Sequence, residues 1–102
     1  MLAIITGANR GIGLEIARSV LAAGYDVVMA CRNVELAAQV RDSLASEFGN
    51  VKIEVEKLDL ASLQSVSAFA ERMLERGRRI DLLMNNAGSL SDRHVTTVDG
   101  LD

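Results

Sequence analysis

Short apolar runs alternate with amphipathic segments along most of the chain, and this alternation constrains the fold more than any other feature. Each apolar run has about the length of a strand that is buried in a sheet. The segments between the runs repeat their apolar residues at helical spacing. The expected strands are residues 2–6, 25–30, 51–55 and 80–84, and the expected helices are residues 12–23, 36–48 and 63–76.

The resulting order, β-α-β-α-β-α-β, predicts an α/β fold. Strands that alternate with helices favour a parallel sheet with right-handed crossovers. We therefore predict a Rossmann-like parallel sheet with strand order 3-2-1-4, an incomplete doubly wound fold. Residues 51–55 alternate apolar and charged side chains, which suits a strand nearer the sheet edge. A chain of 102 residues is enough for one domain and too short for two.

Composition excludes several classes of function. A net charge of −3 provides no general field that would attract nucleic acid. One cysteine and one histidine cannot build a zinc site, and no metal site is expected. No apolar stretch approaches the roughly 20 residues that span a bilayer, and no secretory leader is visible. We expect a cytoplasmic protein without a nucleic-acid partner or a membrane segment.

The stretch TGANRGIG, residues 6–13, joins the first expected strand to the first expected helix. Free backbone N–H groups and the helix dipole favour a phosphate at such a turn. Gly7 suits the tight turn, Gly11 the close approach of a ligand, and Gly13 close contact between helix and strand. The alternative is a tight connection without a ligand, but the position in the first βαβ unit favours phosphate binding. No Gly-Lys-Ser/Thr follows, which excludes a kinase-type P-loop.

The spacing Thr6-Gly7-x-x-x-Gly11-x-Gly13, followed by NNAG at residues 85–88, closely resembles the short-chain dehydrogenase/reductase family. The segments ACRN (residues 30–33) and DGLD (residues 99–102) are similar to its retinol dehydrogenases, carbonyl reductases and related NADP-linked reductases. The resemblance covers the whole chain. It implies that residues 1–102 are the N-terminal part of a single NAD(P)-binding Rossmann domain. It also implies an oxidoreductase that transfers hydride between the nicotinamide cofactor and a small carbonyl or alcohol substrate.

The choice between NAD and NADP depends on the end of the second strand. NAD-binding members carry a carboxylate there, which accepts a hydrogen bond from the ribose 2′-hydroxyl. In this chain the neutral Cys31 takes that position, Arg32 follows it, and Arg10 lies in the glycine turn. Two guanidinium groups would bind a 2′-phosphate, each contact contributing about 1.5–3 kcal/mol. NADP (NADPH) is therefore favoured over NAD, with a solvated surface charge as the alternative for either arginine.

The resemblance also implies contacts with the adenosine. Asp59 matches the family acid at the adenine amino group, with the backbone of Leu60 beside it. The alternative is an N-cap of the third helix, a role that Asp59 or Ser62 could fill. Asn85 is expected to hold the NNAG turn against the sheet, with its side-chain amide satisfying buried backbone groups. The full set of predicted cofactor-binding residues is Gly7, Asn9, Arg10, Gly11, Ile12, Gly13, Arg32, Asn33, Asp59, Leu60, Asn86, Ala87 and Gly88.

No catalytic residue is predicted in this chain. The family's catalytic serine, Tyr-x-x-x-Lys pair and asparagine lie, in relatives, beyond the point where the chain ends. Tyr25 is expected at the opposite end of the sheet from the cofactor. Ser89 and Ser91 follow the NNAG turn too closely in the sequence to be the catalytic serine. Cys31 is interpreted as a small buried residue rather than a redox thiol. His94 is interpreted as a plain surface histidine.

We expect the chain to be a fragment, inactive alone, with an unpaired apolar edge at residues 80–84 and apolar patches on the sheet faces. Two interpretations stay open. The first is the cofactor-binding portion of an NADP-dependent oxidoreductase. The second is a truncated, non-catalytic module that binds a dinucleotide or a partner. The sequence leaves the substrate undecided, and it leaves open whether the protein forms a homo-oligomer.

Overall fold

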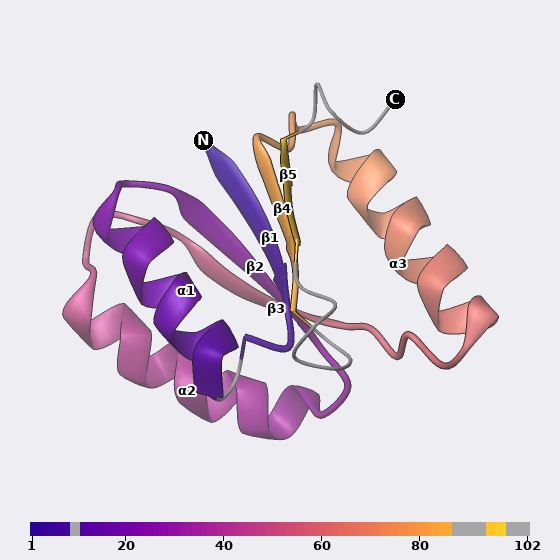
Figure 1. The fold of residues 1–102 in the computed structure, drawn as a ribbon, viewed down its shortest axis with the longest axis horizontal. Helices are drawn as coiled ribbons and strands as arrows, with labels where there is room; N and C mark the ends of the chain where they lie inside the picture. The colour runs from indigo at the N-terminus through magenta and orange to yellow at the C-terminus, as the bar shows by residue number, and fades with distance from the viewer. Residues whose placement is uncertain (9–10, 87–93, 98–102) are drawn as a thin grey trace.

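The computed structural model describes residues 1–8, 11–86 and 94–97. Figure 1 shows one twisted sheet with helices on both faces, and its strand order is β3-β2-β1-β4-β5. The strands β1 to β4 pair in parallel, which confirms the predicted order 3-2-1-4. The elements are β1 (Leu2–Thr6), α1 (Gly11–Ala22), β2 (Asp26–Cys31), α2 (Val34–Glu47), β3 (Ile53–Lys57), α3 (Leu63–Arg76), β4 (Leu82–Asn85) and β5 (His94–Thr97).

The prediction of an unpaired edge at β4 is wrong. β5 pairs antiparallel with β4, from Leu82 opposite Thr97 to Asn85 opposite His94. Residues 95–97 are all β-branched, a composition typical of strands. The prediction missed this strand because the residues around it are polar and suggested a loop. β4 is therefore an inner strand, whereas β3 lies at the sheet edge as expected.

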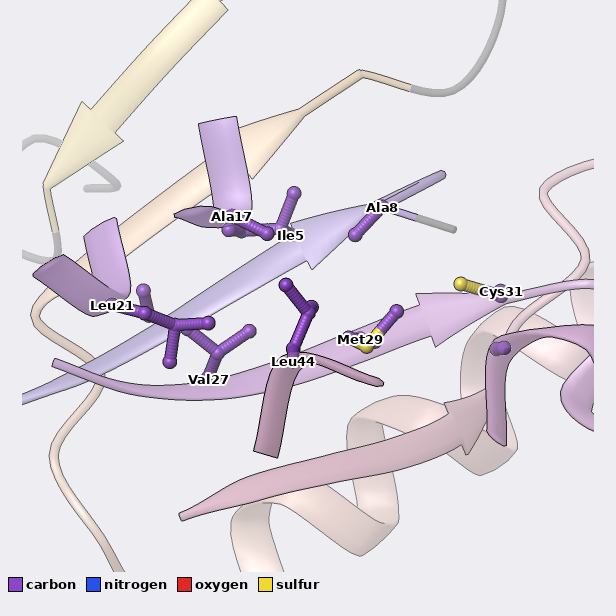
Figure 2. Close-up of a cluster of buried hydrophobic side chains, with 10 residues drawn as sticks. Ile5, Ala8, Ala17, Leu21, Val27, Met29, Cys31 and Leu44 are labelled. Carbon is purple, nitrogen blue, oxygen red and sulfur yellow. The ribbon is translucent and has the colours of Figure 1, made fainter. Parts of the chain in front are cut away.

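The central strands β1 and β2 each contribute side chains to two separate buried clusters, one on each face of the sheet. In β1, Ala3 and Ile5 belong to one buried cluster, and Leu2 and Ile4 belong to the other. This alternation follows from the two-residue period of a strand. Helices α1 and α2 cover the first cluster, and α3 lies on the opposite face (Figure 1). Figure 2 labels Ile5, Ala8, Ala17, Leu21, Val27, Met29, Cys31 and Leu44 of the first cluster.

The face that carries α3 is less completely covered. Met73 of α3 is buried, but Leu63 and Leu74 are 86% and 80% exposed. A groove of about 820 Å³ runs between α3 and the sheet, lined mainly by apolar side chains. The expected apolar patch is therefore present on this face. None of the helices in the described residues is both long enough and apolar enough to cross a bilayer.

Local signals account for the helix ends. The side chain of Asn33 accepts from the backbone N–H of Leu36 and caps α2, and that of Ser62 accepts from Ser65 and caps α3. Gly77 ends α3 in the left-handed conformation, with φ of 63°. A residue with a side chain would be strained at this φ, so the predicted stop at Gly77 has a backbone cause.

Candidate functional site

The turn after β1 has the backbone conformation of a glycine-dependent loop. Gly7 and Gly11 have φ of 65° and 60°, a region that residues with side chains rarely adopt. The backbone N–H of Gly7 donates to the carbonyl of Ala30, which ties the turn to the end of β2. Asn9 and Arg10 lie outside the described residues. Glycine is therefore required at 7 and 11 by the chain path itself.

Gly13 brings α1 unusually close to this turn. A Cβ atom at position 13 would lie 2.2 Å from the carbonyl oxygen of Gly7 and 2.5 Å from Nδ2 of Asn86. Only glycine permits such an approach. The amino end of α1 consequently lies directly against the turn, at the carboxyl end of β1 (Figure 1). Ile12, next to Gly13, is 42% exposed at this end.

The amino end of α1 is suited to bind an anion. The helix has 12 residues, enough to develop a dipole, and its first turn contains no acidic residue that would compete for the N–H groups. The first N–H groups of a helix have no partner within the helix. In α1 they lie at the carboxyl end of β1, which is the end where doubly wound sheets bind ligands. The arrangement can hold a phosphate group without a charged side chain.

Two hydrogen bonds join β1 to the end of β4 beside the turn. The hydroxyl of Thr6 donates to Oδ1 of Asn85 over 3.1 Å, and it accepts from the backbone N–H of Asn86 over 2.8 Å. Thr6 is only 5% exposed. The expectation that Asn85 holds the turn against the sheet is met, but through the Thr6 hydroxyl rather than a backbone group. Ala87 and Gly88 lie outside the described residues, as do Ser89, Ser91 and the DGLD segment.

Sequence reasoning missed Thr6 as part of the site. The available signal was a hydroxyl at the carboxyl end of an otherwise apolar strand. Such a group needs a hydrogen-bond partner when it is buried, and the nearest polar segment in the predicted sheet was the start of NNAG.

The end of β2 places a buried thiol next to two exposed polar residues. Cys31 is 3% exposed and lies in the core under α1 and α2 (Figure 2), which agrees with its interpretation as a small buried residue. Arg32 and Asn33 are exposed. The side-chain oxygen of Asn33 is already used as the cap of α2, a structural role that the sequence prediction did not include. Only its amide group is left to contact a ligand.

Arg32 differs from the other arginines in the described part of the chain. Each of the others lies at ion-pair distance from a carboxylate, whereas no ion pair involves Arg32. An exposed guanidinium group without a carboxylate keeps its donors available for an added anion.

Asp59 and Leu60 follow β3, at the same carboxyl end of the sheet as the glycine turn. Ser62, not Asp59, caps α3, so the two alternatives for the cap are resolved. Oδ1 of Asp59 accepts from the backbone N–H of Ala61, and the Asp59 N–H donates to the Ser65 hydroxyl. The first bond fixes the carboxylate orientation. Leu60 is 47% exposed beside it.

The single tyrosine lies at the other end of the sheet from the glycine turn. Tyr25 precedes β2, and its backbone N–H donates to Val20 at the end of α1, on the opposite side of the sheet from the glycine turn. This position agrees with the expectation that Tyr25 lies at the end of the sheet opposite the glycine turn. The backbone of His94 lies in β5, but its side chain is outside the description. Among the described residues, no group of three acidic, histidine or cysteine side chains could hold a metal ion.

A mostly parallel sheet of this order, with a glycine turn at the end of its first strand, defines an α/β fold of the Rossmann type. A family model described as short chain dehydrogenase matches residues 1–100, and the chain belongs to that family. Retinol dehydrogenase 13 of Mus musculus is 38% identical over 99 residues, which cover 97% of this chain and 30% of that protein.

Solved structures of similar proteins agree with this assignment. L-sorbose reductase of Gluconobacter frateurii, complexed with NADPH and L-sorbose, has a TM-score of 0.78 at 34% identity, covering 86% of this chain and 33% of that one. An alcohol dehydrogenase of Thermococcus sibiricus, complexed with 5-hydroxy-NADP, has a TM-score of 0.72 at 35% identity, covering 80% of this chain and 34% of that one. The chain thus spans about a third of the length of the proteins it matches.

Proposed function

We propose that this chain is the NADP(H)-binding portion of a short-chain oxidoreductase that transfers hydride between the cofactor and a carbonyl or alcohol substrate. The observation that carries the proposal is the turn formed by Gly7, Gly11 and Gly13 against the amino end of α1. Family membership and the NADP-containing relatives support the same function.

The described residues fit the adenosine and phosphate half of such a cofactor. In this proposal the N–H groups at the start of α1 bind the pyrophosphate, and Asp59 with Leu60 contacts the adenine. Arg32, which no carboxylate neutralises in the described part, binds the 2′-phosphate. The segment that begins at Asn86 runs past the adenosine ribose. Four more contacts with the cofactor are proposed on the grounds of sequence alone, by Asn9, Arg10, Ala87 and Gly88.

The cofactor supplies the hydride chemistry when it is bound, and the chain supplies position and charge. The buried Cys31 leaves the end of β2 without a carboxylate, so no negative charge repels a 2′-phosphate there. No residue of the described part is assigned a catalytic role.

The test compares NADP⁺ and NAD⁺ binding by isothermal titration calorimetry in the wild-type chain and in Arg32→Ala. We expect the variant to lose roughly 10- to 150-fold in NADP⁺ affinity, the equivalent of one charge-assisted contact of about 1.5–3 kcal/mol, with little change for NAD⁺. Arg41→Ala, on the exposed surface of α2 and paired with Asp42, is the matched control. An equal loss for both cofactors would contradict the proposed role of Arg32.

A further inference from the structure

A second cation lies beside Arg32. Lys57 is the last residue of β3, and its backbone is paired with Cys31 at the end of β2. Nζ of Lys57 lies 3.5 Å from the carbonyl oxygen of Arg32. Two strands that are adjacent in the sheet thus bring Lys57 and Arg32 together although 25 residues separate them in sequence.

The backbone at Lys57 is anchored on both sides. The carbonyl of Lys57 accepts from Nη2 of Arg72 on α3 over 2.8 Å, and the next N–H, of Leu58, donates to Cys31 over 3.0 Å. The position of the ammonium group is therefore limited mainly by the side chain's own rotamers. Its contact with the Arg32 carbonyl uses one of three donors, and the other two have no acceptor among residues 1–8, 11–86 and 94–97.

The nearby glutamates do not neutralise Lys57. Glu54 and Glu56 form ion pairs with Arg72 and Arg76 of α3, on the other face of the sheet. Strand alternation places Lys57 on the opposite face from these glutamates, the face that carries α1 and α2. Within the described residues, neither Lys57 nor Arg32 forms an ion pair with a carboxylate.

We infer that Lys57 is a specificity-determining residue that, together with Arg32, binds the 2′-phosphate of NADP(H). The inference rests on the proposed cofactor function and adds a residue that the glycine motif does not indicate. Two uncompensated cations at adjacent strand ends create a local positive potential at the edge where the adenosine ribose is proposed to bind. A phosphate dianion gains charge–charge attraction from both cations, whereas a neutral ribose hydroxyl can accept only a weaker hydrogen bond from either.

The experiment titrates NADP⁺ and NAD⁺ into wild-type, Lys57→Gln, Lys57→Arg and Lys52→Gln chains, using calorimetry at two salt concentrations. Lys52→Gln removes the same charge from an exposed lysine at the other end of β3 and is the matched control. We expect Lys57→Gln to weaken NADP⁺ binding about 3- to 10-fold and to leave NAD⁺ binding unchanged. Lys57→Arg and Lys52→Gln should retain the wild-type preference, and the effect of Lys57→Gln should shrink at high salt.

Three results would overturn the inference. Equal NADP⁺ affinities of Lys57→Gln and Lys52→Gln, with the wild-type preference intact, would reject the role of Lys57 while the proposed function stands. An equal loss for both cofactors would show that Lys57 acts on the fold, which far-ultraviolet circular dichroism would register independently. A wild-type chain without a preference for NADP⁺ would reject the proposed cofactor and the role of Lys57 together.

Discussion

At the residue scale, two glycines of the turn serve different physical needs. Gly11 has nothing within 4 Å of an added Cβ, so its requirement comes from its φ of 60° alone. Gly13 has no such φ, and its requirement comes from contact with the Gly7 carbonyl. One is needed for backbone conformation and the other for packing.

Replacing Gly13 by alanine should therefore destabilise the chain through a steric clash. Because the nearest atom is a backbone oxygen, either the turn or α1 must shift, and we expect a loss of about 1–3 kcal/mol in the free energy of unfolding. Gly49→Ala is the matched control, since its Cβ would meet nothing within 4 Å and its φ is not positive. Urea unfolding followed by circular dichroism measures both, because the chain has no tryptophan. Equal urea midpoints for Gly13→Ala and Gly49→Ala would contradict the proposed steric clash at Gly13.

At the element scale, the ends of helices and strands carry much of the specific polar bonding. Asn33 both caps α2 and follows Arg32 at the proposed phosphate site. The start of β2 is held by Asp26, whose Oδ1 accepts from the Lys52 N–H and whose Oδ2 lies 2.8 Å from Arg78. These contacts join elements that periodicity alone cannot place in register.

The two roles of Asn33 can be separated by substitution. Asn33→Ala should lose about 0.5–2 kcal/mol of stability because the Leu36 N–H loses its cap. Asn33→Asp should keep the stability, because aspartate caps equally well, but weaken NADP⁺ binding through repulsion of the 2′-phosphate. Urea midpoints test the loss of stability in Asn33→Ala, and NADP⁺ titrations test the loss of affinity in Asn33→Asp. An Asn33→Asp chain that binds NADP⁺ like the wild type would place the 2′-phosphate elsewhere.

Asp26 should contribute to the acid sensitivity of the fold. The hydrogen bond from the Lys52 backbone, and then Arg78, lower the pKa of this carboxyl below its ordinary value, although partial desolvation opposes them. A lowered folded-state pKa means that the stabilisation is present above the unfolded pKa of about 3.9 and is lost as pH falls through the folded value. Asp26→Asn should therefore be less stable than wild type at pH 6, and the difference should narrow below about pH 4. Urea midpoints measured from pH 6 to pH 3 would show this, and a constant difference would contradict it.

At the scale of the whole molecule, the two faces of the sheet are packed unequally. α1 and α2 cover the core on one face, and α3 lies on the other face (Figure 1). An apolar groove remains between α3 and the sheet. Arg72 and Arg76 hold α3 to β3 through Glu54 and Glu56, so ion pairs supplement apolar contact there. The stability of the chain should depend mainly on the first face.

Truncating one leucine on each face tests this asymmetry. Leu44 of α2 is fully buried, and Leu44→Ala should cost about 2–5 kcal/mol through lost contacts and a cavity. Leu74 of α3 is 80% exposed, and Leu74→Ala should change stability by less than about 0.5 kcal/mol. Urea unfolding measures both variants. A large loss in Leu74→Ala would mean that the α3 face is covered in solution.

Much of the fold and part of the site could be predicted from the sequence. Helix and strand periodicity, glycine stops and the crossover rule depend on residues close together in the chain, so they led to the correct strand order. Strand bounds shifted by one or two residues, as for β3, which was expected at residues 51–55 and lies at Ile53–Lys57. Pairing with β2 sets these ends, and the apolar pattern within β3 does not. The pairing of β5 was missed because a short polar strand has little periodicity.

The sequence by itself determined the order of the elements and the position of the glycine turn at the end of β1, because both are encoded in local spacing. Only the tertiary structure decided which distant residues meet there. It joined Thr6 to Asn85 across 79 residues, assigned the α3 cap to Ser62, and placed Lys57 beside Arg32. Those contacts depend on which residues of neighbouring elements lie opposite one another in the folded sheet, and local spacing within one element does not specify that.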